Sequence, residues 1–163
     1  MVKKEFVLHI GTLFVFIVSV IVFKRWFDLA YWPFLVGGIL GTILPDIDHL
    51  IYVYFVSPQD LTSQRVSYLV YRREILRSIS LLYETRSERK SLIFHSTIFQ
   101  IIFWILCFLV ITSSGSIFGR GLVLAFSLHI VVDQAIDFKF QNLKPTPYFY
   151  LNVLILLFFG ILL

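Results

Sequence analysis

Long apolar runs dominate this sequence and restrict the folds that it can adopt. Of its 163 residues, 58% are hydrophobic and 15% are charged, whereas a soluble domain averages about 45–50% apolar and about 25% charged residues. Each run approaches the ~20 residues that a helix needs to cross ~30 Å of hydrocarbon. We therefore expect one all-α membrane domain over residues 1–163, a polytopic helical bundle of about five transmembrane helices. These spans are expected at residues 6–23, 29–44, 92–111, 121–138 and 148–163.

Three of these spans leave room for alternatives. The first resembles a signal peptide, but Lys24-Arg25-Trp26 follows it in place of a small-residue cleavage site. The second can end at Pro45, which removes a helical hydrogen bond, or continue to residue 56. The last run is near the short limit for a crossing, so four spans are the alternative to five. Gly37 and Gly41 form a small-xxx-small pair in the second span, which lets a neighbouring helix approach closely.

Residues 57–91 interrupt the apolar pattern with a basic amphipathic segment. Ser57-Pro58-Gln59-Asp60 is typical of a helix start, with Ser at the cap and Pro at the first helical position. Apolar residues then recur near one face as far as Tyr83. We expect a cytoplasmic amphipathic helix lying on the membrane surface. Four arginines would contact anionic lipid: Arg65, Arg72, Arg73 and Arg77.

The distribution of charge predicts how the chain is oriented. The net charge is +4, but half of the 14 basic residues lie between Arg65 and Lys90, so no nucleic-acid partner is expected. With a cytoplasmic N-terminus, five spans place eleven basic residues on the cytoplasmic side and three outside, as the positive-inside rule favours. We therefore expect an integral protein of the plasma (inner) membrane. The single cysteine, Cys107, excludes an intrachain disulfide and a cysteine-based zinc site.

This orientation brings the polar residues of the spans to one depth on the cytoplasmic side. His129 and Asp133 are four positions apart, and so lie on one helical face, while Asp46 and His49 are three apart. Carboxylates and imidazoles are costly near a membrane interior unless something compensates them, and both are ligands of divalent metals. The candidate metal ligands are His9, Asp46, Asp48, His49, His95, His129 and Asp133.

Structural roles are the alternative for each part of this set. His9 alone would fit a helix–helix hydrogen bond, His129 and Asp133 an interhelical clamp, and residues 46–49 a solvated helix end. As a metal site, seven candidates exceed the four positions of tetrahedral zinc, so one or two ions are expected, with the remaining residues as a base or as orienting groups. A bound divalent metal, zinc being the expected one, would activate water for hydrolysis. Asp46 or Asp48 would act as the catalytic base.

Three stretches together resemble one family. They are Gly41–His49, then His95-Ser96, then Leu128–Asp133. This pattern is similar to that of the YdjM-like membrane-bound metal-dependent hydrolases, also described as LexA-binding, inner-membrane-associated hydrolases. The resemblance implies that the six residues Asp46, Asp48, His49, His95, His129 and Asp133 form a metal and catalytic site, and His9 matches an early histidine of the pattern. The stretch before His95 departs from the family, which usually has His-Arg-Gly-x-Thr-His-Ser there.

The sequence thus predicts a metal-dependent hydrolase acting on an ester or phosphoester, such as a lipid, at the cytoplasmic interface. The alternative is a non-catalytic membrane protein whose His/Asp cluster binds metal or clamps helices, while the basic segment recruits a cytoplasmic partner. A transporter is a weaker alternative, because the outer halves of the spans have almost no ionisable groups.

Overall fold

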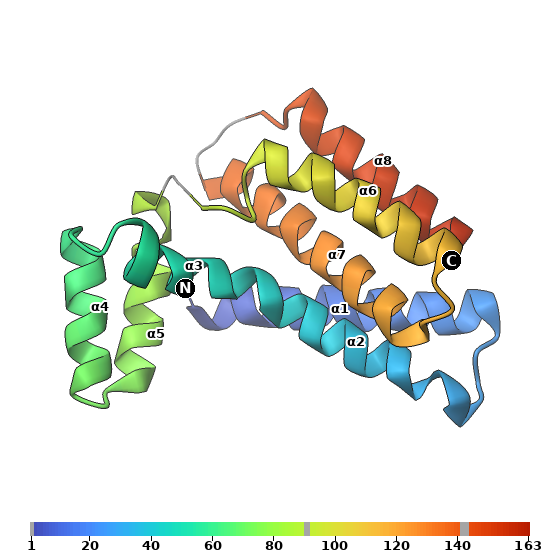
Figure 1. The fold of residues 1–163 in the computed structure, drawn as a ribbon, viewed down its shortest axis with the longest axis horizontal. Coiled ribbons are helices and arrows are strands. Elements are labelled where there is room, and N and C mark those ends of the chain that lie inside the picture. The colour runs from blue at the N-terminus through green and yellow to red at the C-terminus, as the bar shows by residue number, and fades with distance from the viewer. Residues whose placement is uncertain (1, 90–91, 141–143) are drawn as a thin grey trace.

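The computed structural model describes residues 2–89, 92–140 and 144–163, and all regular structure within these ranges is helical (Figure 1). Lys90 and Ser91, where the departure from the family pattern begins, lie outside the described residues. The α-helices are α1 (Val2–Lys24), α2 (Trp32–Ile43), α3 (Ile47–Ile51), α4 (Leu61–Tyr71), α5 (Ile75–Glu84), α6 (Thr97–Ser113), α7 (Ile117–Phe140) and α8 (Pro147–Leu162).

Among the residues that the structure describes, three helical segments are long and apolar enough to cross a membrane. They are Val7–Lys24 in α1, Leu29–Val56 around α2 and α3, and Ile117–Lys139 in α7. These segments confirm a helical protein with candidate membrane spans. The helices α6 and α8 are apolar but shorter, and both pack against α7 (Figure 1).

The second of these segments passes Pro45 without ending. A 3₁₀ turn (Leu44–Asp46) places Pro45 near its start, where the missing N–H leaves no hydrogen bond unmade. The chain then continues through α3 and a π-helical turn (Tyr52–Val56). The helical segment therefore continues to Val56 and does not end at Pro45. Asp46, Asp48 and His49 lie inside this segment, between the 3₁₀ turn and the π-helical turn.

Helices α2 and α7 approach so closely that their backbones touch. A Cβ atom added at Gly37 would overlap the carbonyl oxygen of Phe118, and one added at Gly41 would overlap that of Leu122. Gly121 of α7 stands in the same relation to the backbone of α2. The small-xxx-small pair therefore does what its spacing predicts. It holds α7, which carries His129 and Asp133, against α2, which leads into residues 46–49.

The basic segment forms two helices rather than the single amphipathic helix expected. The break lies at Arg73, whose φ of 59° is left-handed, and the N–H of Glu74 donates to the carbonyl of Leu69 at 2.9 Å. This pattern closes the end of α4 in a Schellman motif, a position that glycine usually occupies. Helices α4 and α5 form a hairpin that crosses one end of the bundle, the end where the N-terminus lies (Figure 1).

A buried amide network joins α6 and α8 to α7. The side-chain oxygen of Gln100 accepts hydrogen bonds from Gln134 at 3.0 Å, from Tyr148 at 2.9 Å and from Asn152 at 3.1 Å. The side-chain nitrogen of Gln100 donates to the backbone oxygen of His95 at 3.1 Å. The network therefore both clamps the three helices and holds the loop that carries His95.

Candidate metal centre

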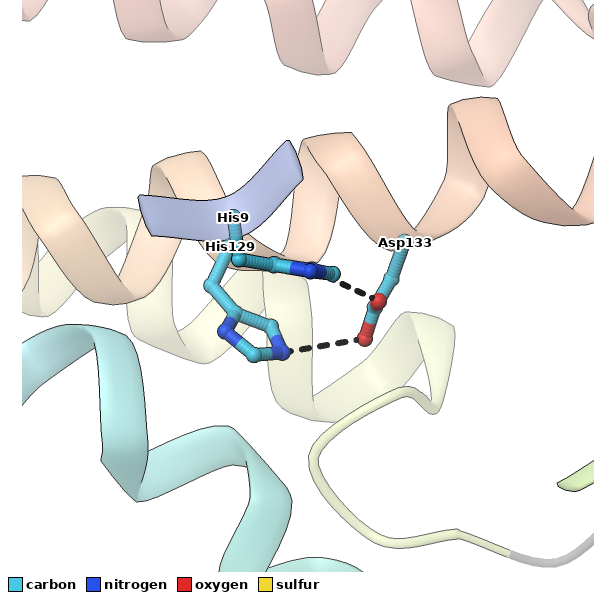
Figure 2. A group of neighbouring side chains, drawn as sticks. All are labelled: His9, His129 and Asp133. Atoms are coloured by element: carbon cyan, nitrogen blue, oxygen red, sulfur yellow. Dashed lines mark hydrogen bonds and ion pairs between the residues drawn. The ribbon is translucent and has the colours of Figure 1, made fainter. Parts of the chain in front are cut away.

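Asp133 of α7 is the centre of a cluster built from distant parts of the chain. His9, near the start of α1, places Nε2 3.0 Å from Asp133 Oδ1. His95, in the loop before α6, places Nε2 2.9 Å from Oδ2, and His129, one helical turn before Asp133, places Nε2 3.2 Å from Oδ2. Figure 2 shows His9 and His129 converging on the carboxylate. Three imidazole nitrogens thus surround one buried carboxylate.

The group formed by His9, His129 and Asp133 can hold a metal ion. One ligand atom from each residue lies within 4.8 Å of the others, all three residues are buried, and the two rings lie 4.2 Å apart between centroids. Although His129 Nε2 lies 3.2 Å from Asp133 Oδ2, neither nitrogen of His129 has a hydrogen-bond partner among the described residues. Because a buried polar atom without a partner is unfavourable, this imidazole fits a cation ligand.

Asp48 orients His95. Its carboxylate accepts the backbone N–H groups of Ile93 at 3.0 Å and Phe94 at 2.6 Å, and it lies 3.2 Å from His95 Nδ1. A carboxylate on one imidazole nitrogen typically directs the other nitrogen to a metal. Burial lowers the pKa of His95, but hydrogen bonds to Asp133 and Asp48 outweigh burial and raise this pKa to about 9, so a metal ion would have to displace the proton from Nε2 in order to bind there.

The two other predicted ligands lie at the edge of the cluster. Asp46 Oδ1 is 3.7 Å from His129 Nε2, and the Asp46 side chain is 40% exposed. His49 Nδ1 accepts a hydrogen bond from Arg89 Nε at 3.1 Å. Because a neutral imidazole carries one proton, that bond assigns the proton of His49 to Nε2. His49 therefore has no lone pair directed at the cluster while Arg89 holds it.

Two arginines of the basic segment turn inward, which the sequence analysis missed. Arg86 Nη1 donates to Asp133 Oδ1 at 2.9 Å, and Nη2 lies 3.5 Å from Asp137. Arg89 is buried, and its burial together with the charge of Arg86 lowers the pKa of Arg89 to about 10, so it stays charged near neutral pH. An amphipathic pattern treats every arginine as a surface residue. The available signal was that both residues follow the last apolar position of that pattern, Tyr83.

A cavity of about 220 Å³ adjoins the cluster between α3 and α5. Asp46 and Arg86 belong to both, because each lines the cavity and each contacts a residue of the cluster. The remaining lining is mostly apolar and consists of His49, Leu50, Ile79, Leu82 and Tyr83. The cluster thus has a carboxylate and a guanidinium facing a space that a small group can enter.

Comparison with known protein families, with curated proteins and with solved structures found no match.

Proposed function

We propose that this protein is a membrane-embedded, metal-dependent hydrolase that cleaves an ester or phosphoester at the cytoplasmic interface. The convergence of three histidine Nε2 atoms on Asp133, beside a cavity with Asp46 at its edge, carries this proposal. Such a concave site with a few converging polar groups is the usual form of an active site. The resemblance of Gly41–His49 and Leu128–Asp133 to the YdjM-like hydrolases supports the same reaction class.

In this proposal His9, His129 and Asp133 hold the metal, and His95 completes the set. Three imidazoles and one carboxylate suit tetrahedral zinc. A catalytic site needs one coordination position for water, and His95 or Asp133 would leave the metal to provide it. A bound divalent cation would supply an acidic water and polarise the oxygen of the scissile bond.

The remaining carboxylates take different roles. Both oxygens of Asp48 are engaged by the loop before α6, so Asp48 positions His95 and does not act as the base. Asp46 is more exposed and lines the cavity next to His129, so we assign it as the base that accepts a proton from the attacking water.

We further propose five spans with a cytoplasmic N-terminus. Helices α1, α2, α6, α7 and α8 run back and forth, and the two termini lie at opposite ends of the bundle (Figure 1). The N-terminal end also carries α4, α5 and the turn between them. Four arginines of this hairpin would contact anionic lipid at the cytoplasmic face: Arg65, Arg72, Arg73 and Arg77.

A reporter fused after Leu163 tests this topology. Five spans place that reporter outside the cytoplasm, whereas four place it inside. The same reporter inserted in the turn between α4 and α5, at Glu74, is the matched control and is expected inside. A cytoplasmic signal from both fusions would contradict five spans.

The metal content of the purified protein tests the site. We expect about one zinc ion per chain in the wild type, and a loss of most of it in His129→Ala. His49→Ala is the matched control. It removes an imidazole from the same region, but this imidazole accepts a hydrogen bond from Arg89 and is not an assigned ligand. Elemental analysis of the three proteins in detergent gives the comparison.

Each other outcome would contradict a part of the proposal. A wild type without metal would contradict the hydrolase. Metal retained in His129→Ala, or lost in His49→Ala, would contradict the assigned ligands. If metal behaves as expected but carboxylic and phosphoric ester substrates are not turned over, the protein is not a hydrolase of this class.

A non-catalytic role is the second candidate, and one observation favours it. Arg86 and the histidines already surround Asp133, so that the cluster can also join α1, α7 and the loop before α6 as a polar clamp. The wild-type metal content separates the two, since a clamp needs no ion.

A further inference from the structure

We propose that Arg86 binds the anionic group of the substrate and that the substrate is an amphiphilic phosphate ester. This inference rests on the proposed hydrolase function and assigns the substrate class of the same site. The guanidinium of Arg86 donates to Asp133, which is an assigned metal ligand, and the metal site alone does not explain this contact.

Arg86 pairs with Asp133 and Asp137, and it would therefore lie close to a metal ion bound by Asp133. Its Nη1 and the Nε2 atom of His9 approach the same oxygen of Asp133, at 2.9 and 3.0 Å. The Arg86 side chain is 15% exposed, so solvent screens its charge only weakly. A divalent cation held by His9 and Asp133 would repel this guanidinium. An anion that lies between the two positive charges removes that repulsion.

The chemistry of guanidinium selects the anion. Arginine stays charged and presents paired N–H donors that match the oxygens of a phosphate. A carboxylic ester is uncharged, and its hydrolysis gains nothing from a second buried cation before the transition state. The pair formed by a metal ion and Arg86 therefore favours a phosphate ester over a carboxylic ester.

The size and lining of the cavity indicate an amphiphile. At about 220 Å³ the cavity is smaller than the ~300–1,000 Å³ of pockets that enclose a whole ligand. Leu50 and Ile79 line it and are also 43% and 42% exposed, so the apolar wall continues onto the outer surface. The phosphate end of a lipid fits inside, while its chains remain in the bilayer.

The reaction implied is ordinary hydrolysis. The oxygen of water forms a new bond to phosphorus, and the ester bond from phosphorus to the alcohol oxygen breaks. Asp46 takes a proton from the water and releases it to solvent, and the leaving alcohol takes up one proton from solvent, so water is the only co-reactant.

The binding of inorganic phosphate to the zinc-loaded protein tests Arg86 without turnover. We expect Arg86→Gln to retain zinc and to weaken phosphate binding by tenfold or more in calorimetry. Arg86→Lys is expected to lie between the two, because it keeps the charge and loses the paired donors. Arg25→Gln is the matched control, since Arg25 is exposed and follows the end of α1, a long way along that helix from His9. Unchanged phosphate binding in Arg86→Gln would overturn the assignment.

Turnover then tests the substrate class. We expect dihexanoyl phosphatidic acid to be hydrolysed with a kcat/KM at least tenfold above that of glycerol 3-phosphate, and p-nitrophenyl acetate to be a poor substrate. Arg86→Gln should raise the KM for the phosphate ester and leave the acetate unaffected. Equal turnover of lipid and soluble phosphate would overturn the amphiphile, and preference for the acetate would overturn the phosphate. If the purified wild-type protein contains no zinc, this result would instead contradict the proposed hydrolase function.

Discussion

Gly41→Leu is expected to unfold the protein or to separate α2 from α7. The added side chain would start where Leu122 has its backbone carbonyl, and a helix backbone cannot turn away as a side chain can. The two helices must move apart, and the buried contact along their length is lost. Overpacking of a core costs ~1–3 kcal/mol where side chains can adjust, so we expect a loss at or above ~3 kcal/mol here. Thermal unfolding in detergent, followed by circular dichroism, measures it.

Glycines elsewhere in the bundle provide the control. A Cβ atom added at Gly11 of α1 or at Gly160 of α8 would meet nothing within 4 Å. Gly11→Leu and Gly160→Leu add the same side chain and are expected to change stability by less than ~0.5 kcal/mol. If Gly41→Leu were as stable as these controls, the close α2–α7 contact would be wrong.

The same contact explains why much of the fold could be predicted from the sequence. Apolar runs long enough to span a membrane have few alternatives to a helix. The spacing of Gly37 and Gly41 predicts that another helix packs closely against this face. The partner itself was not predicted, although Gly121 and Ala125 form a second small-xxx-small pair in the chain. It was found only where its backbone meets that of α2.

The two irregular regions were harder to predict for a different reason. The break between α4 and α5 rests on Arg73 in a left-handed conformation, and arginine gives no sign of this where glycine would. The turns after Pro45 depend on packing against α7 and α4, because the local sequence suits either an end or a kink. Tertiary contacts decided both.

The residues of the candidate site could be named from the sequence, but their roles could not. His9, His95, His129 and Asp133 converge because α1, α7 and the loop before α6 bring these positions to one level of the bundle. Nothing in the sequence distinguishes His49, whose Nδ1 is held by Arg89, from the histidines that face Asp133. That distinction depends on hydrogen bonds made across the fold by residues forty positions away.

Asp133→Ala is expected to remove the metal and also to destabilise the metal-free protein. The substitution leaves Arg86 without the carboxylate that neutralises it, and it leaves three imidazoles around an empty buried position. Removing one partner of a buried ion pair typically costs ~3–5 kcal/mol, because the other charge stays buried. Unfolding of the metal-free proteins by denaturant measures this loss apart from any effect of the ion.

Two further variants separate the charge of Asp133 from its size and its partner. Asp133→Asn keeps the shape of the side chain, and we expect it to lose metal with a smaller loss of stability than Asp133→Ala. The double variant Asp133→Ala/Arg86→Ala should be more stable than Asp133→Ala alone but should still bind no metal. Asp137→Asn is the control, because its side chain is 48% exposed and its contact with Arg86 is longer, so we expect less than ~1 kcal/mol. A metal-free Asp133→Ala protein as stable as the wild type would show that Arg86 finds another neutralising group in the fold. In that case the pairing of Arg86 with Asp133 would not hold the cluster together, and the bound ion alone would have to do so.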